Sequence, residues 1–329
     1  MKVLITGGLG FIGSNLIDHI RACFPLNVDI VIMDDQSTGK NFCVLEHDKV
    51  DYYEGDISIQ QDLEKLPTDI THCVHLAAAI SVAESVKDPE KYHRINVEGS
   101  RKLFNHLITT CPNLVKICGA SSAAVYGNEL RLPIKEYYCE GDSFLSPYAE
   151  SKYLMEKIMG ELEIDTCAFR FFNVFGPRQD PKSPYTGVIS IFMDRALANK
   201  KLIIFGDGEQ SRDFIFVHDL CRAITTYLFE NHPGHLVMNL GTGKTSTITE
   251  LADTCVTVCK SASEIEYGPE REGDIKHSCS CVEVAKTVLK WEAIESLTTG
   301  LPLVLDFMQE NFGEKQIVTL ETSSAAGVQ

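Results

Sequence analysis

The stretch KVLITGGLGFIG, residues 2–13, decides the fold of this chain. An apolar strand, Lys2–Thr6, runs into a glycine-rich turn, and a helical pattern from about Phe11 to Cys23 follows. In such a unit Gly7 permits the tight turn, Gly10 lets the backbone approach a diphosphate, and Gly13 lets the helix pack closely on its strand. The unpaired N–H groups and positive dipole of the helix N-terminus then attract the phosphates. This stretch therefore predicts a dinucleotide-binding site.

An acidic residue downstream supports this interpretation. Asp34 follows the second apolar strand, Asp29–Met33, roughly 20 residues after the last glycine of the motif. Its carboxylate can accept hydrogen bonds from both adenosine ribose hydroxyls and would repel a 2′-phosphate, which favours NAD over NADP. A turn or helix-capping aspartate is the alternative interpretation. Further cofactor contacts are expected from Phe11, Ile12, Asp35, Asp56, Ile57, Leu76, Ala77, Ala78, Asn96 and Phe171.

The pattern beyond the motif alternates strands with helices. This alternation predicts an α/β fold, a doubly wound parallel sheet of the Rossmann type with helices on both faces. The strands expected after the first two are Val50–Tyr53, Cys73–Leu76, Val115–Ala120 and Thr166–Phe171. The helices expected between them are Ile59–Lys65, Pro89–Cys111 and Tyr148–Leu162.

The character of the chain changes after about residue 173, which predicts two domains. We expect an NAD-binding domain over 1–173, with returning segments near 213–242. A smaller, interleaved C-terminal substrate-binding lobe is expected over 174–312. Residues 313–329 have little apolar pattern and are expected to form a flexible tail.

Composition excludes several classes of protein. The formal net charge is −16, and no basic face of the kind that binds nucleic acid is visible. No apolar stretch reaches the roughly 20 residues that a membrane span needs, and four glycines in the first segment argue against a cleaved signal peptide. The 12 cysteines are irregularly spaced, and the Cys279-Ser-Cys281 pair lacks zinc-site spacing. We therefore expect free thiols in a reducing cytoplasm and no metal.

A candidate catalytic pair lies in Tyr148-Ala-Glu-Ser-Lys152. Four residues apart on a helix, the two side chains share one face, and the ammonium of Lys152 can stabilise the phenolate of Tyr148. The pair alone is common and often only structural. Ser121 and Ser122 end an apolar strand, and a hydroxyl there could share the reacting hydroxyl of a substrate with Tyr148.

Together these motifs resemble the extended short-chain dehydrogenase/reductase family. The resemblance rests on the glycine motif, Ser121-Ser122-Ala-Ala-Val-Tyr126-Gly127, Tyr148-x-x-x-Lys152 and Phe171-Phe172-Asn173-Val-Phe-Gly176-Pro177-Arg178. More narrowly, Arg178-Gln-Asp-Pro, Arg212-Asp213-Phe214 and Arg271-Glu272-Gly273-Asp274 resemble the UDP-glucose and UDP-N-acetylglucosamine 4-epimerases. The similarity covers about residues 1–312.

The resemblance implies a mechanism and a set of site residues. Ser122 takes the catalytic Ser/Thr position, Tyr148 is the base at the sugar O4, and Lys152 holds the nicotinamide ribose. The sugar passes through a 4-keto state, and NAD stays bound because each cycle regenerates it. The implied UDP-sugar contacts are Ser121, Ser122 and Tyr148 with Asn173, the diphosphate-binding Arg212 and Arg271, Asp274 at the uridine ribose, and Val188, Phe205 and Gly206 around the uracil.

The family also implies a homodimer with a four-helix interface built from Pro89–Cys111 and Tyr148–Leu162 of each subunit. On the first of these segments the apolar positions Ile95, Leu103 and Leu107 suit such an interface, and suit packing on the sheet equally well.

The choice of reaction rests on two small residues. Dehydratases and decarboxylases of this fold tend to have Asp or Glu after the catalytic Ser/Thr, whereas this chain has Ala123-Ala124, which cannot move an extra proton. We therefore expect reversible 4-epimerisation of a UDP-hexose. A UDP-uronate epimerase or decarboxylase is the alternative, and a non-catalytic protein that binds NAD and nucleotide sugars is the alternative from another class.

The identity of the sugar depends on Ser278. In the epimerases the fourth residue after the Asp of Arg-Glu-Gly-Asp walls the sugar pocket, and here it is this serine. A small residue leaves room for an acetamido group, so UDP-GlcNAc and UDP-GalNAc are expected substrates, with UDP-Glc and UDP-Gal also possible. Room for the acetamido group permits an N-acetylated sugar, but it does not show that this sugar is preferred over a plain hexose.

Overall fold

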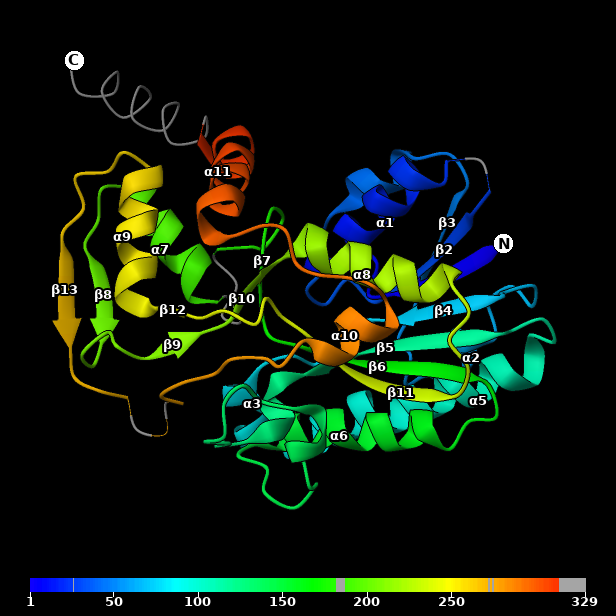
Figure 1. Ribbon diagram of the computed structural model, residues 1–329. Coiled ribbons are helices and arrows are strands. Elements are labelled where there is room, and N and C mark those ends of the chain that lie inside the picture. Colours follow the sequence, from blue (N-terminus) through cyan, green and yellow to red (C-terminus); the bar gives the residue numbers. More distant parts are fainter. Residues whose placement is uncertain (26, 182–186, 272, 274, 314–329) are drawn as a thin grey trace, which may run out of the picture.

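A seven-stranded parallel sheet forms the centre of the computed structural model, which describes residues 1–25, 27–181, 187–271, 273 and 275–313 (Figure 1). The strand order is β11-β6-β5-β4-β1-β2-β3. It reverses between β1 and β4, as expected of a doubly wound fold, and so confirms the predicted fold class. The strands are β1 (Lys2–Thr6), β2 (Asp29–Asp34), β3 (Val50–Glu54), β4 (His72–His75), β5 (Lys116–Ser122), β6 (Asp165–Phe171) and β11 (His235–Leu240).

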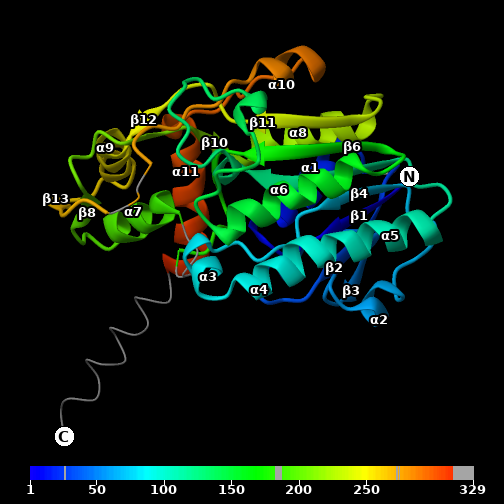
Figure 2. The same ribbon diagram turned by 90° about the horizontal axis from the view of Figure 1, so that it is seen from below.

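Helices cover both faces of the sheet. One face packs against α1 and α8, and the other packs against α5 and α6; the second set lies in front of the strands in Figure 2. The helices around the sheet are α1 (Phe11–Cys23), α2 (Gln60–Leu63), α3 (Val82–Lys87), α4 (Pro89–Tyr92), α5 (Ser100–Thr110), α6 (Pro147–Gly160), α8 (Val217–Phe229) and α10 (Glu283–Val288).

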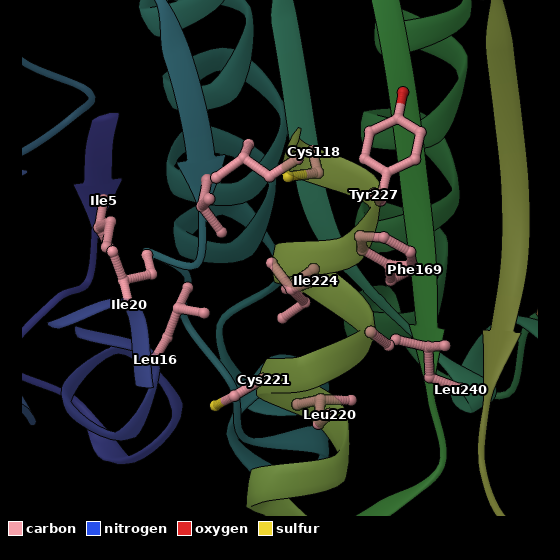
Figure 3. Close-up of a cluster of buried hydrophobic side chains, with 14 of the residues drawn as sticks. Ile5, Leu16, Ile20, Cys118, Phe169, Leu220, Cys221, Ile224, Tyr227 and Leu240 are labelled. Carbon is pink, nitrogen blue, oxygen red and sulfur yellow. The ribbon is translucent and has the colours of Figure 1, made fainter. Parts of the chain in front are cut away.

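The core on the α1–α8 face is apolar and closely packed. Figure 3 shows Leu16 and Ile20 of α1, Ile224 of α8 and Phe169 of β6 within this cluster, and all four are buried. Burying one such side chain contributes about 1.5–3 kcal/mol. These contacts fix both helices on the sheet, and so fix the glycine turn at the start of α1.

The long helix expected over Pro89–Cys111 is not a regular α-helix. Between α4 and α5 lies a π-helical segment, η2 (His93–Gly99), which contains Asn96. The apolar period continues through η2, so the sequence pattern did not reveal the change in hydrogen bonding. The remaining predicted elements differ from the observed ones mainly at their ends, and α2 is shorter than expected.

A second group of elements has its own core at one end of the sheet (Figure 1). Three two-stranded sheets pair β7 with β10, β8 with β13 and β9 with β12. Helix α11, which the sequence pattern did not predict, packs into this core through Leu301 and Val304. The elements are β7 (Asn173–Phe175), α7 (Val188–Leu197), β8 (Leu202–Phe205), β9 (Ser211–Arg212), β10 (Phe214–Phe216), β12 (Ser246–Thr247), α9 (Ile248–Val258), β13 (Ile265–Gly268) and α11 (Leu297–Met308).

Short helical segments complete the described chain. They are the 3₁₀ segments η1 (Phe42–Glu46), η3 (Ala123–Tyr126) and η4 (Glu136–Tyr138) and the π-helical η5 (Gln309–Gly313). All 12 cysteines fall within the described ranges as free thiols. None of the helices described there has the length and apolar character needed to span a membrane. Asp274 and residues 314–329 of the expected tail lie outside the described residues.

Candidate active site

The glycine turn leaves no room for side chains. Gly7 has a φ of +70°, and a Cβ there would lie 2.8 Å from the backbone nitrogen of Ala77. A Cβ on Gly13 would lie 2.3 Å from the carbonyl oxygen of Gly7. Gly10 is the N-cap of α1 and provides no side-chain hydrogen bond to the first turn. The open N-terminus of α1 therefore fits the diphosphate of a dinucleotide.

Asp34 lies directly beside this turn. It is 5% exposed, and its carboxylate accepts hydrogen bonds from the backbone N–H groups of Leu9, at 3.0 Å, and Gln36, at 2.8 Å. Burial raises the pKa of this carboxyl, and the two backbone donors oppose the rise. Because each carboxylate oxygen has a second lone pair, Asp34 can still receive ribose hydroxyls. The neighbouring Asp35 is exposed and accepts from Ser37.

The ends of β3 and β4 lie near the turn. Asp56 accepts a hydrogen bond from the backbone of Ser58 at 2.7 Å. Ile57 is 3% exposed and packs in the core on the α5–α6 face, so its side chain is not available to a cofactor. At the end of β4, the N–H groups of Leu76 and Ala77 both donate to Oγ1 of Thr6, each at 3.2 Å. Ala78 follows in the same loop.

Asn96 joins this loop to the helix of the candidate catalytic pair. Its side-chain amide bonds to both backbone groups of Ala79, accepting from N–H at 2.8 Å and donating to the carbonyl oxygen at 2.9 Å. It also donates to the hydroxyl of Ser151 on α6 at 3.0 Å. Asn96 therefore holds the loop after β4 against α6, next to Lys152.

Ser122, Tyr148 and Lys152 come together at the end of β5. Ser122 is the last residue of that strand, Tyr148 lies in the first turn of α6, and a side-chain hydrogen bond joins them. Lys152 donates to the carbonyl oxygen of Ala120 at 2.8 Å, and its Nζ lies 5.9 Å from the centre of the Tyr148 ring. The structure thus brings the three sequence-predicted groups to one place.

The pKa values of Tyr148 and Lys152 do not by themselves favour the phenolate that the sequence analysis expects. Burial raises the pKa of the Tyr148 phenol, and the hydrogen bond with Ser122 partly offsets that rise. Burial also lowers the pKa of Lys152 to about 8. The chain alone therefore favours the neutral phenol, so a positive charge from a bound nicotinamide ring must help to ionise it.

Phe205 and Arg271, both predicted to contact the UDP, lie against each other. The guanidinium carbon of Arg271 stands 3.9 Å from the centre of the Phe205 ring. Gly206 follows with a φ of +83°. Phe205 and Gly206 line a small cavity of about 30 Å³, together with Asp207, Gln210, Glu270 and Lys276. Val188 begins helix α7 and is half-buried.

Arg212 and Ser278 meet around Ser211. One guanidinium nitrogen of Arg212 donates to the carbonyl oxygen of Ser211 at 2.9 Å, and the N–H of Ser278 donates to the same oxygen at 3.1 Å. Ser278 is 8% exposed. Asn173, at the start of β7, is exposed and donates to the carbonyl oxygen of Asp213 at 3.2 Å. Phe171 ends β6 beside Ser122.

Ser121 does not join the catalytic group. It is 2% exposed, and its hydroxyl donates to Glu156 of α6. Glu156 in turn holds Arg170 of β6. Sequence reasoning did not assign these two charged residues. The available signal was spacing, because Glu156 continues the four-residue period of Tyr148 and Lys152.

Asp213 is a third residue that sequence reasoning did not assign. It is fully buried, and its carboxylate accepts hydrogen bonds from Thr242, Gly243 and Ser280. It thereby ties the turn after β11 to the segment that contains Ser278 and Ser280.

Known proteins resemble this chain over most of its length. A UDP-glucose 4-epimerase of Mycolicibacterium smegmatis is 32% identical over 321 residues, covering 94% of this chain and 99% of the relative. A UDP-glucuronic acid decarboxylase of Arabidopsis thaliana is 30% identical, covering 99% and 72%. The solved UDP-N-acetylglucosamine 4-epimerase of Methanobrevibacter ruminantium, in complex with UDP-N-acetylmuramic acid, aligns with a TM-score of 0.85 and 34% identity, covering 94% and 99%.

The family comparison agrees with the geometry of the glycine turn and with the expected cofactor, NAD. Residues 3–241, which include the turn, the end of β5 and the start of α6, match a family described as NAD dependent epimerase/dehydratase. This chain belongs to that family, the NAD dependent epimerases and dehydratases.

Proposed function

We propose that this protein catalyses the reversible 4-epimerisation of a UDP-hexose, with UDP-GlcNAc and UDP-GalNAc as substrates and UDP-Glc and UDP-Gal as further candidates. The observation that carries the proposal is the meeting of Ser122, Tyr148 and Lys152 at the end of β5. Asn96 links their helix to the loop beside the glycine turn, so the base and the cofactor site belong to one rigid unit.

In the proposed reaction Tyr148 takes the proton from O4 of the sugar while the hydrogen at C4 leaves as hydride. NAD⁺, when bound at the glycine turn, would supply the hydride acceptor and then the hydride donor. Ser122 hydrogen-bonds the reacting oxygen and keeps it aligned with the phenol. The 4-keto sugar would then turn, so that C4 is reduced on its opposite face and Tyr148 returns the proton to O4. No atom is gained or lost overall.

The nucleotide end of the substrate would be held by local positive charge. The chain as a whole carries a formal charge of −16, so a diphosphate needs nearby cations to overcome the general repulsion. Arg212 and Arg271 are suited to this because guanidinium groups bind phosphate oxygens in pairs. With Arg271 packed over Phe205, the uracil would occupy the adjoining space beside Gly206.

The residues around the reacting carbon favour epimerisation over elimination. Ala123 and Ala124 form the turn η3 directly after Ser122, and their methyl groups can neither donate nor accept a proton. The decarboxylase among the relatives makes loss of carbon dioxide from a UDP-uronate the second candidate. The small side chain of Ser278 supports a substrate with an acetamido substituent.

Product analysis tests the proposal. The protein is incubated separately with UDP-GlcNAc, UDP-Glc and UDP-GlcA, and the products are identified by mass and by sugar composition. Epimers of the first two, with unchanged mass, are expected. Loss of carbon dioxide or water from any of the three would replace the proposed reaction.

A variant pair links the reaction to its base. Tyr148→Phe should abolish turnover while NAD remains bound, because the phenyl ring keeps the shape and loses the proton acceptor. The matched control is Tyr137→Phe, since Tyr137 is 71% exposed and belongs to segment η4 rather than to α6. Full turnover by Tyr148→Phe would remove Tyr148 from its proposed role.

The homodimer and the cytoplasmic location remain predictions from the sequence. Leu103 and Leu107 are fully buried against the sheet, so this apolar face is committed to the core and is not available to a partner. Any four-helix interface would have to use the outward faces of α5 and α6. Light scattering on the purified protein measures the oligomeric state directly.

A further inference from the structure

Three side chains on one face of α6 contact three consecutive residues of β5. Tyr148 bonds to Ser122, and Lys152 donates to the carbonyl oxygen of Ala120. Glu156, one turn further along, accepts the hydroxyl of Ser121. Because residues four apart stand in line along a helix, one face of α6 makes all three contacts with the end of β5. The first two belong to the proposed catalytic group, and the third does not.

The third contact is anchored from a neighbouring strand. Arg170 lies directly opposite Ser121 in the pairing of β5 with β6, so both side chains point to the same face of the sheet. The guanidinium of Arg170 donates to both carboxylate oxygens of Glu156, at 2.9 and 2.7 Å. Glu156 is therefore fixed by two strands at once.

The third guanidinium nitrogen of Arg170 is also occupied. One guanidinium nitrogen donates to the hydroxyl of Tyr126 at 3.1 Å and to the carbonyl oxygen of Glu136 at 2.7 Å. The hydroxyl of Tyr126 donates to Asn239 of β11 at 2.5 Å. An arginine that donates from all three of its guanidinium nitrogens cannot easily change its position, so it holds Glu156 in one geometry.

The cluster is almost completely withdrawn from water. Ser121, Glu156 and Arg170 are each 2–3% exposed. A buried ion pair is weak evidence of a stabilising role, because desolvation offsets much of the attraction, but its geometry is specific. The helix cannot slide along the strand without separating the carboxylate from Ser121 and Arg170.

From this arrangement we propose that Glu156 is a positioning residue: clamped by Ser121 and Arg170, it sets the register of α6 on β5 and so places Tyr148 at Ser122. The expected change in kcat rests on the proposed function. The pKa of Tyr148 reports the register of α6 on β5 without any turnover. Other titratable groups facing Tyr148 are Lys152 on α6 and Tyr92 on α4, whose ring centre lies 6.3 Å from that of Tyr148.

The test uses Ser121→Ala, which removes the contact from β5 and leaves the Glu156–Arg170 pair intact. A small shift of α6 weakens the Ser122–Tyr148 hydrogen bond, which normally lowers the pKa of the phenol. The pKa of Tyr148 should therefore rise, as followed by tyrosinate absorbance with the Tyr148→Phe protein subtracted. With an epimerisable UDP-sugar, kcat should fall roughly tenfold to a hundredfold with little change in KM.

The control is Thr225→Val, which also deletes a buried hydroxyl, in this case one that bonds only within α8. It should change neither the pKa of Tyr148 nor kcat. The double variant Glu156→Met/Arg170→Met removes the pair without leaving an unpaired charge, and it should reproduce the effects of Ser121→Ala.

The outcomes separate the two proposals. A rise in KM with an unchanged Tyr148 pKa would make Ser121 a substrate contact and overturn the positioning role. An unchanged pKa and kcat in Ser121→Ala would overturn it as well, even if the double variant did not fold. If the wild-type protein epimerises no UDP-sugar, the proposed function fails, and the tyrosinate titration still decides the role of Glu156.

Discussion

The ammonium of Lys152 donates a hydrogen bond to the carbonyl oxygen of Ala120, 2.8 Å away, in a site where the lysine is 4% exposed. Tyr148 stands one helical turn before Lys152, and Ser122 lies two residues beyond Ala120, so this bond ties the helix to the strand at the reacting end of the site. A charge held there by a single acceptor is costly to bury.

Lys152→Met should therefore stabilise the fold while it inactivates the protein. Burial lowers the pKa of Lys152 from 10.5 to about 8, so the unfolded chain binds more protons between these values and wild-type stability rises with pH by up to ~1.4 kcal/mol per pH unit. The advantage of the variant should be greatest below pH 8 and shrink towards pH 10.5. Denaturant unfolding across this range checks it; an advantage that grew with pH would contradict the buried charge.

Gly13→Ala should weaken both folding and NAD binding. Its Cβ would lie 2.3 Å from the carbonyl oxygen of Gly7 and 2.7 Å from Cα of Gly8, so the turn must open. We expect a loss of about 1–3 kcal/mol in the free energy of unfolding and reduced NAD content. Gly187→Ala is the control, since its nearest neighbour would be 3.6 Å away. Equal stability of the two variants would show that the turn tolerates a side chain.

Asp34→Asn should reduce NAD affinity more than Asp35→Asn does. The carboxylate of Asp34 is buried and accepts two backbone N–H groups, and an amide would turn its own donor towards one of them. The lost charge-assisted hydrogen bonds correspond to roughly a tenfold to hundredfold rise in Kd. Calorimetric titration of cofactor-depleted protein measures both variants, and a larger effect at the exposed Asp35 would reverse the assignment.

Ser278→Tyr should reduce turnover of UDP-GlcNAc selectively. Ser278 is 8% exposed, and a phenol ring there would fill the space proposed for the acetamido group. The ratio of kcat/KM for UDP-GlcNAc to that for UDP-Glc should fall at least about tenfold. Ser278→Ala, which adds no bulk, should keep the wild-type ratio. An equal loss on both sugars would place the acetamido group elsewhere.

His75→Gln should flatten the loss of stability in acid. Burial lowers the pKa of His75 from 6.5 to about 3, and Lys152 adds to the effect. Between these values the unfolded chain binds the extra proton, so wild-type stability falls as pH falls, by up to ~1.4 kcal/mol per pH unit. Unfolding curves between pH 6 and 4 compare the slopes. The control is His93→Gln, which removes an exposed imidazole and should leave the slope unchanged. Identical slopes for the wild-type protein and both variants would contradict the prediction.

The local patterns of the sequence determined much of this protein. Glycines at positions 7, 10 and 13 after a strand are typical of the turn that binds a dinucleotide. The four-residue spacing of Tyr148 and Lys152 puts both side chains on one helical face wherever that helix packs. The alternation of apolar strands and helices likewise determined the fold class, because each period depends only on neighbours along the chain.

Only the tertiary structure decided which polar groups meet. Ser121 and Ser122 are identical in type and adjacent in sequence, yet Ser121 is joined to Glu156 and Ser122, the last residue of β5, is joined to Tyr148 in the first turn of α6. The packing of α6 on β5 decides which hydroxyl meets which side chain. Asp213 gathers partners about 30 and 67 residues away. A partner that distant leaves no periodic trace in the sequence, since the contact exists only once packing brings separate elements together.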